Sequence, residues 1–193
     1  MPELFTDIQD LRDQLDAAEL DARSLVEDLA EERGCWRPDA NEWSVAQCLE
    51  HLALSNRIYL SAMREPAIRA RIAGRLRRGP ALPGFAGRWF AAKMEPPVRA
   101  SAKMKTMRKL KPETAPSLAD AFASFLQSQD EIRDYLRMNA DLDLAGIRFP
   151  NPFVPGIRFS VATGLHVLTA HERRHLWQAW RVRRAAEGVT REA

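Results

Sequence analysis

The chain has 193 residues, a hydrophobic content of 46% and a formal net charge of +3. This length suits one apolar core, so we expect a single domain over residues 1–193. No run of 18 apolar residues exists, and the first residues, MPELFTDIQD, are acidic where a signal peptide would be basic and then apolar. A membrane span and a secretion signal are therefore not expected, and we predict a soluble, cytoplasmic protein.

The charges are unevenly distributed along the chain. Residues 64–111 contain fourteen Lys and Arg residues and two glutamates, a net charge of about +12, whereas the rest of the chain is acidic. Such a segment could bind nucleic acid or another anionic surface. The simpler interpretation is a solvated crossover that neutralises an acidic first helix, so neither nucleic acid nor a membrane is the expected partner. The two cysteines, Cys35 and Cys48, are too few for a disulfide framework and are expected as thiols.

Two helices are expected in the first third of the chain. In residues 4–30 the apolar side chains recur every three or four positions, which predicts a helix that ends near Gly34. The second helix is expected to begin at Trp43 or Ser44. Ser44 and Gln47 form a capping box, in which each side chain satisfies a free backbone N–H of the first turn.

Two more helices are expected after a long basic connection over residues 64–116, which itself contains short helices broken by Pro96 and Pro97. The third helix begins after Ser117, and its inward stripe consists of Leu118, Phe122, Phe125, Gln129, Ile132 and Leu136. The stretch DLDLAGIRFPNPFVPGIRF is too rich in proline and glycine to be helical, and the fourth helix follows it from Ser160. Four such helices without a convincing strand pattern predict an all-α fold, a four-helix bundle with a long crossover connection.

The fourth helix contains His171-Glu172-Arg173-Arg174-His175, which matches the HExxH pattern of zinc peptidases. Residues four apart on a helix differ by about 40° in direction, so both imidazoles can reach one metal ion. The peptidase context is missing, because two arginines occupy the middle of the motif and few residues follow it to supply another ligand. We therefore predict a metal site but not a peptidase.

A third ligand is needed, and three histidines from two helices can converge on one ion. His171 and His175 lie on the stripe Gly164, Leu168, His171, His175, Gln178 and Val182, whereas His166 points away from it. His51 lies on a polar line of the second helix, which reads Ser44, Cys48, His51, Ser55 and Ile58. A lone histidine on such a face is more often a hydrogen-bonded core residue. The assignment of His51 as a ligand therefore depends on the paired histidines and on the resemblance described next.

Two segments carry a family resemblance: Trp43-Ser44 with Glu50-His51-Leu52, and His171-Glu172-Arg173-Arg174-His175-Leu176 with Gln178. Both resemble motifs of the DinB/YfiT-like superfamily of metal-dependent enzymes. The resemblance covers residues from about 4 to 186. It implies a four-helix bundle with a long crossover and a divalent metal held by His51, His171 and His175. Members with an assigned activity are similar to thiol-dependent transferases or isomerases that use mycothiol, bacillithiol or glutathione. The basic insertion at 64–111 is longer than the usual crossover, so pocket details do not carry over.

Several neighbours of this predicted site have two interpretations. Cys48 is either a fourth, thiolate ligand or a buried structural thiol. Gln129 and Gln178 either orient an imidazole or fix the helix register. Trp36, Trp43, Trp177 and Trp180 are expected in core and loop packing, with a pocket wall as the alternative. Glu172 and Glu50 are weak candidates for a general base because each points away from its histidine, so the catalytic residues are unknown.

Two classes of function remain open. The first is a metal-dependent transferase or hydrolase that acts on a small molecule, with a low-molecular-weight thiol as cosubstrate. The second is a non-catalytic, metal-stabilised bundle that acts as a binding or stress-response protein through its basic crossover or a dimer face. An open coordination position favours the first, and a closed fourth ligand favours the second. We expect zinc or nickel as the ion, with iron as a third choice, and a homodimer.

Overall fold

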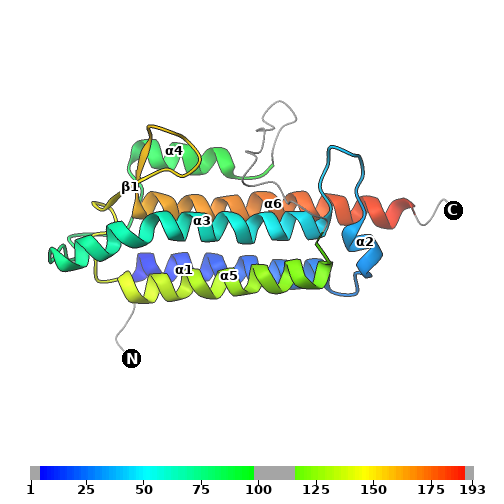
Figure 1. Ribbon diagram of the computed structural model, residues 1–193, viewed down its shortest axis with the longest axis horizontal. Helices are drawn as coiled ribbons and strands as arrows, with labels where there is room; N and C mark the ends of the chain where they lie inside the picture. The colour runs from blue at the N-terminus through cyan, green and yellow to red at the C-terminus, as the bar shows by residue number, and fades with distance from the viewer. Residues whose placement is uncertain (1–4, 98–115, 190–193) are drawn as a thin grey trace.

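The structure is a computed structural model that describes residues 5–97 and 116–189. Four long helices lie side by side (Figure 1): α1 (Thr6–Val26), α3 (Val45–Ile72), α5 (Leu118–Asn139) and α6 (Val161–Val189). Helices α1 and α6 run in one direction, and α3 and α5 run in the other. Each helix packs against its parallel neighbour, α1 on α6 and α3 on α5. Each also packs against one antiparallel helix, α1 against α5 and α3 against α6. The predicted all-α bundle is confirmed.

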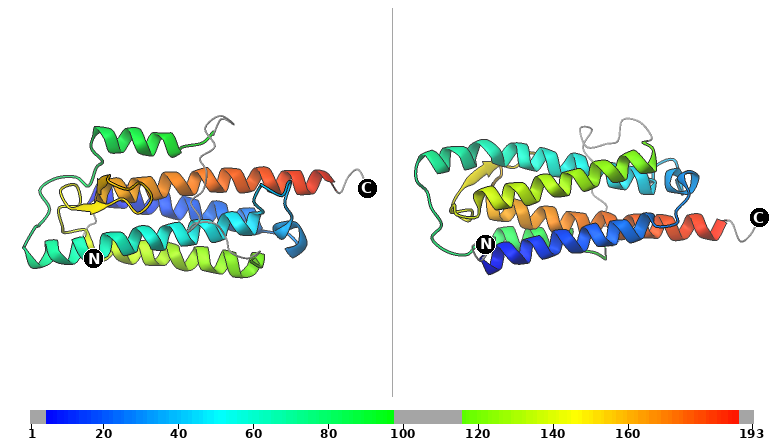
Figure 2. Two further views of the ribbon diagram at one scale, coloured as in Figure 1. Left: turned by 45° about the horizontal axis from the view of Figure 1, so that its top comes forward. Right: turned by 90° about the horizontal axis from the view of Figure 1, so that it is seen from below.

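The long crossover follows from this arrangement, because α3 and α5 are parallel neighbours and the chain must return along the bundle between them. The short helix α4 (Phe85–Met94) lies in this connection and packs on α6 (Figure 2). It ends before Pro96, as predicted, while residues 98–115 lie outside the described part. The connection begins later than residue 64, because α3 continues through Pro66 to Ile72.

The predicted helix starts are confirmed at two serines. The hydroxyl of Ser44 accepts a hydrogen bond from the N–H of Gln47, whose side chain accepts one from the N–H of Ser44, and this completes the capping box of α3. Ser117 caps α5 by accepting from the N–H of Asp120. Both signals are local, since the residues involved lie within one helical turn.

The predicted end of the first helix is wrong. Helix α1 stops at Val26, and a separate short helix, α2 (Glu31–Cys35), follows a turn in which Asp28 has φ of 56°. This left-handed backbone conformation is tolerated by aspartate better than by most residues, and it redirects the chain across the end of the bundle. The expected single helix to Gly34 is therefore two helices.

A two-stranded hairpin lies in the proline-rich stretch before α6. Strand β1 (Arg148–Pro150) pairs in antiparallel fashion with β2 (Arg158–Ser160), and Phe149 lies opposite Phe159. Both rings are buried in the core, which fixes the hairpin on the bundle. The stretch is non-helical, as predicted, but the strands were not expected because three residues are too few to show a period of two.

Buried polar side chains divide the core of the bundle. The larger apolar cluster includes Met63, Phe149 and Leu168, and the second includes Leu49, Phe125 and Leu176. Five of the buried polar residues, on α3, α5 and α6, form what we call the polar layer: Ser55, Asn56, Ser128, Gln129 and Glu172. None of the helices in the described part of the chain has the length and hydrophobicity of a transmembrane segment.

Candidate metal centre

Three histidines from two helices meet beside the polar layer. His51 lies on α3, about two turns after the Ser44 cap, and His171 and His175 lie one turn apart on α6. One ring nitrogen from each histidine lies within 4.8 Å of one from each of the others. The ring centroids are 5.1 Å apart for His51 and His171, and 4.5 Å apart for the other two pairs. The structure thus brings together the three residues that the sequence predicted.

The donor atoms fit a small divalent ion. Nε2 of His51 and Nε2 of His171 are 3.3 Å apart. Two imidazole nitrogens bound to one tetrahedral zinc at the usual bond length lie about 3.4 Å from each other. Nδ1 of His175 is buried and has no hydrogen-bond partner among the residues that the structure describes. A buried ring nitrogen without a partner is costly unless a ligand satisfies it, so the cluster is suited to a metal.

The protonation of the cluster also suits a metal, which binds neutral imidazole. Burial lowers the pKa of His171 and of His175 well below the usual value of 6.5. The neighbouring histidines and the positive charge of Arg174 lower both pKa values further, while the side chain of Gln178 acts in the opposite direction on the pKa of His175. At neutral pH these two imidazoles are therefore uncharged and available as ligands.

The cluster reaches the surface on one side. The side chains of His51 and His175 are buried, with only 3% and 9% of their surface exposed. His171 is half-buried, so part of its surface is accessible to solvent, although desolvation still lowers its pKa. The indole ring of Trp43 covers another side, with its centroid 4.6 Å from that of His51 and 5.7 Å from that of His175. The packing interpretation of this tryptophan therefore holds, because its ring packs directly on two of the candidate ligands.

Cys48 and His166 lie outside the cluster. Cys48 is fully buried in the apolar cluster around Leu49, and burial raises the pKa of its thiol strongly. A thiol that resists ionisation is a poor metal ligand, so the interpretation as a structural thiol holds. The residues that could jointly hold a metal in the described part of the chain are the three histidines, without Cys48, His166 or a carboxylate.

Glu172 follows His171 in sequence but belongs to the polar layer. Its Oε1 accepts hydrogen bonds from Nδ2 of Asn56 at 2.8 Å and from Nε2 of Gln129 at 2.6 Å. Desolvation raises the pKa of Glu172 to about 7, and the two amide hydrogen bonds offset part of that rise. The carboxylate therefore faces the core and α5, which agrees with the prediction that it is a poor general base for the metal site.

Sequence reasoning missed two members of the polar layer, Asn56 and Ser128. Nδ2 of Asn56 also donates to Oγ of Ser128, which in turn donates to the carbonyl of Phe125. Gln129 was predicted as a polar member of an inward stripe, and its amide contacts Glu172 rather than an imidazole. A signal for the other two existed, since Asn56 and Ser128 interrupt otherwise apolar helix faces, but one polar residue on a face does not reveal its partner.

The three-histidine arrangement on α3 and α6 invites comparison with known proteins. A family model described as the DinB superfamily matches residues 14–179, which include all three histidines and most of the bundle. The chain belongs to the DinB superfamily. No curated protein and no solved structure matches the chain. Membership of the DinB superfamily supports a divalent metal at this site.

Proposed function

We propose that this member of the DinB superfamily is a metal-dependent enzyme, a thiol-dependent transferase or a hydrolase that acts on a small molecule. The observation that carries the proposal is a cluster of three histidines with no fourth protein ligand among the described residues. Structural zinc sites are closed by four protein ligands, whereas catalytic sites keep a position open. The cluster is also accessible at His171. Zinc or nickel is the proposed ion, with iron as a third choice.

A divalent ion held by neutral imidazoles supplies Lewis-acid chemistry, and it lowers the pKa of a water or thiol at its open position. The residues of the chain position the reactants. Trp43 offers a flat apolar surface next to His51 and His175. Arg174 places a positive charge close enough to lower the pKa values of His171 and His175. A small molecule with an anionic group, such as a carboxylate-bearing thiol, is attracted to this combination.

The experiment begins with metal content. Protein purified without a histidine tag and reconstituted with zinc or nickel is expected to hold about one ion per chain, measured by elemental analysis. His51→Ala and His175→Ala should each lose most of the metal, because a two-ligand site binds far more weakly. His166→Ala is the matched control and should keep it. The assignment is wrong if the control loses the metal while His51→Ala retains it.

Turnover is then measured with a panel of thiols, namely glutathione, mycothiol and bacillithiol, each with an electrophilic acceptor, and separately with ester and amide substrates. Arg174→Gln should raise KM for an anionic substrate more than it lowers kcat, because the arginine acts on binding. Metal binding without turnover in any assay would instead favour a non-catalytic, metal-stabilised protein. A homodimer and a cytoplasmic location belong to the same proposal, and sedimentation analysis tests the dimer.

A further inference from the structure

A cavity of about 350 Å³ lies at the end of the bundle where α3 ends and the hairpin begins. It is lined by Pro66, Arg69, Ala70, Ala73, Arg75, Gly146, Ile147, Arg148 and Arg158. We call it the arginine cavity. His51 and Arg69 both lie on α3, eighteen residues apart, which corresponds to about 27 Å along a helix axis. The arginine cavity is therefore separate from the metal centre.

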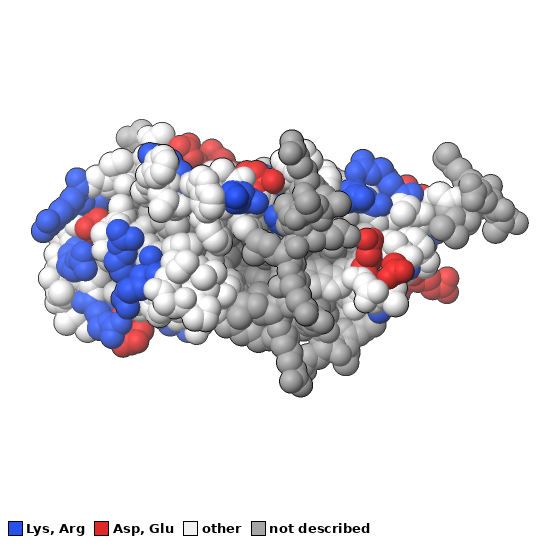
Figure 3. Space-filling view, turned by 90° about the horizontal axis from the view of Figure 1, so that it is seen from above, with Lys and Arg blue, Asp and Glu red and all other residues white. Residues whose placement is uncertain are grey.

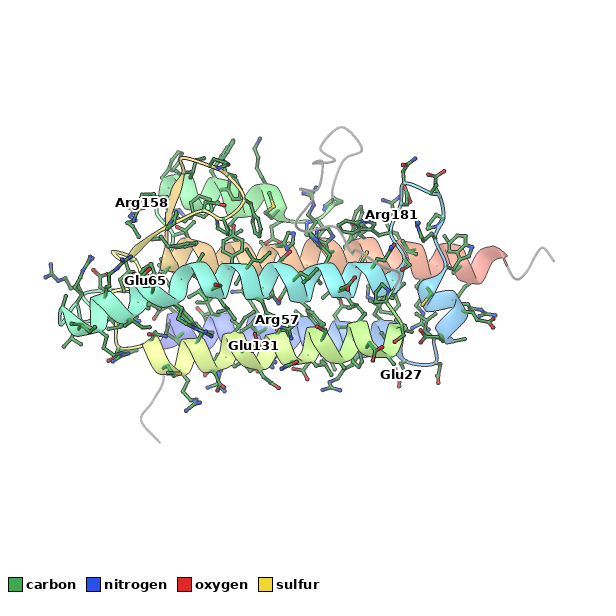
Figure 4. The ribbon with its side chains drawn as sticks, in the orientation of Figure 1. Glu27, Arg57, Glu65, Glu131, Arg158 and Arg181 are labelled. Carbon is green, nitrogen blue, oxygen red and sulfur yellow. The ribbon has the colours of Figure 1, made fainter. Side chains whose placement is uncertain are left out.

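The four arginines converge from three parts of the fold. Arg69 comes from the last turns of α3, Arg75 follows that helix, and Arg148 and Arg158 come from β1 and β2. Figure 3 shows Lys and Arg side chains gathered at this end of the molecule. In Figure 4, Arg158 and Glu65 are labelled there, far from Arg181 on α6.

The hairpin register holds two of these charges close together. Arg148 pairs with Ser160, and Arg158 pairs with Pro150, so the two arginines are diagonal neighbours across the strands. Both are exposed, whereas Phe149 and Phe159 between them are buried. Long side chains in diagonal positions are within reach of one another, so the two like charges lie close together. The guanidinium of Arg158 also donates to the backbone carbonyl of Arg148 at 3.3 Å, which ties this side chain to the neighbouring strand.

Nearby carboxylates compensate only part of this charge. Arg69 forms an ion pair with Glu65 at 2.7 Å, and Arg75 lies 3.9 Å from Asp143. Oδ1 of Asp143 also accepts the N–H of Gly146, so it serves its own loop as well. No carboxylate is among the residues that line the cavity. Four guanidinium groups thus face two acidic neighbours, and the cavity has an excess of positive charge.

The helix dipole explains one of the four arginines but not the hairpin pair. A cation near a helix C-terminus is favourable, which accounts for Arg69 in the last turn of α3. Arg148 and Arg158 belong to strands and receive no such benefit. No carboxylate pairs with either of them among the described residues, so an anion that enters the cavity would meet uncompensated charge.

We propose that the arginine cavity binds the phosphate group of a small phosphorylated molecule. Planar guanidinium groups form paired hydrogen bonds with phosphate oxygens, and several arginines together match a group with more than one negative charge. The cavity volume lies at the lower end of the range of small-molecule sites. Pro66, Ala70 and Ile147 provide an apolar surface for the carbon part of the ligand. The phosphate belongs either to a soluble compound or to the headgroup of a lipid.

The experiment titrates inorganic pyrophosphate into the full chain by calorimetry at constant ionic strength, with sodium chloride as the blank. The double variant Arg148→Gln/Arg158→Gln should weaken binding at least tenfold. Arg137→Gln, which changes an exposed arginine paired with Asp134 on α5, is the control and should bind like the parent. The charge-conserving Arg148→Lys/Arg158→Lys variant should retain part of the affinity, and matching urea unfolding curves show that each variant is folded.

A second arm identifies the source of the phosphate group. Flotation with vesicles of phosphatidylglycerol and phosphatidylcholine, against phosphatidylcholine alone, tests a lipid headgroup. Binding of pyrophosphate alone that the double variant loses supports a soluble ligand at this site, and vesicle binding that it loses supports the headgroup. The proposal is overturned if neither probe binds, or if the double variant binds both as well as the parent does.

Discussion

Glu172 and His171 are adjacent in sequence, yet they serve different parts of the molecule. Glu172→Ala should lower the free energy of unfolding by about 3 kcal/mol, because the amides of Asn56 and Gln129 lose a buried acceptor. Glu172→Gln keeps an acceptor oxygen in the same place and should cost about 1 kcal/mol or less. Urea unfolding measures both values.

Measuring the metal content of the Glu172 variants distinguishes this structural role from the role of a catalytic glutamate or of a metal ligand. Both Glu172 variants should hold as much zinc as the parent, since the carboxylate is not part of the histidine cluster. Loss of the metal from folded Glu172→Gln would show that the glutamate supports the site directly.

The site could be predicted from sequence only as far as helix geometry extends. His171 and His175 share a face because they are four residues apart, and His51 followed from its polar stripe and the family resemblance. The contact of Trp43 with two imidazoles depends on how the loop before α3 folds back, and spacing does not reveal it. Asn56 and Ser128 meet only because α3 packs on α5.

A partly buried ion pair ties the connection after α3 to the start of α1. The guanidinium of Arg77 and the N–H of Ala81 each donate to the carboxylate of Asp7 at 2.5 Å. The side chains of Arg77 and Asp7 are only 13% and 11% exposed. Asp7→Asn should therefore lower the free energy of unfolding at pH 7 by about 2 kcal/mol, whereas Asp10→Asn on the exposed face of α1 should change it little.

The same pair predicts a pH dependence. Burial raises the pKa of Asp7, but the hydrogen bonds from Ala81 and Arg77 together lower it more, so the pKa lies below its usual value of 3.8. The folded state therefore binds this proton less readily than the unfolded state does. The stabilisation is fully present above about pH 4 and is lost as the pH falls through the lowered value. Urea curves of parent and Asp7→Asn, recorded with chelator present, should converge in acid; a constant difference would contradict the mechanism.

Helix α6 passes very close to α3 and the hairpin at Gly164. A Cβ added there would lie 2.8 Å from Cζ of Phe149 and 2.9 Å from Sδ of Met63. Gly164→Ala should lower the free energy of unfolding by about 1–3 kcal/mol, because overpacking exceeds the gain in helix propensity. Gly188→Ala, in the same helix with no atom within 4 Å of the new Cβ, should raise it by up to about 1 kcal/mol. Thermal unfolding of both variants checks the contrast, and equal effects would contradict it.

The elements that the sequence predicted well are those with local causes. Ser44 and Ser117 mark helix starts because their partners lie three residues away. The break at Asp28 was missed because the preceding apolar periodicity continues past it, and the turn is favoured by packing of α2 on the bundle. The extension of α3 beyond Pro66 was missed for a similar reason, since burial of that proline offsets its lost hydrogen bond.

The metal is expected to stabilise a fold that forms without it. Two apolar clusters hold the helices together on either side of the polar layer, so chelation should leave the helical circular dichroism unchanged. At a free zinc concentration about 1,000 times Kd, bound metal adds roughly 4 kcal/mol, which raises Tm by on the order of 10 °C. Differential scanning calorimetry with and without chelator measures the shift. Loss of helix on chelation would mean that the ion is required for folding.

The order of the ligands along the chain determines when the metal site can form during protein synthesis. His51 emerges early, but His171 and His175 lie in the last helix, 120 and 124 positions later. Domains begin to form from the N-terminus while the ribosome is still translating. Until α6 emerges, α1 and α3 lack a neighbour that each of them contacts along its length, and the nascent protein exposes those apolar faces. The metal site therefore cannot form until α6 has emerged, and chaperones can bind the exposed apolar faces of α1 and α3 until then.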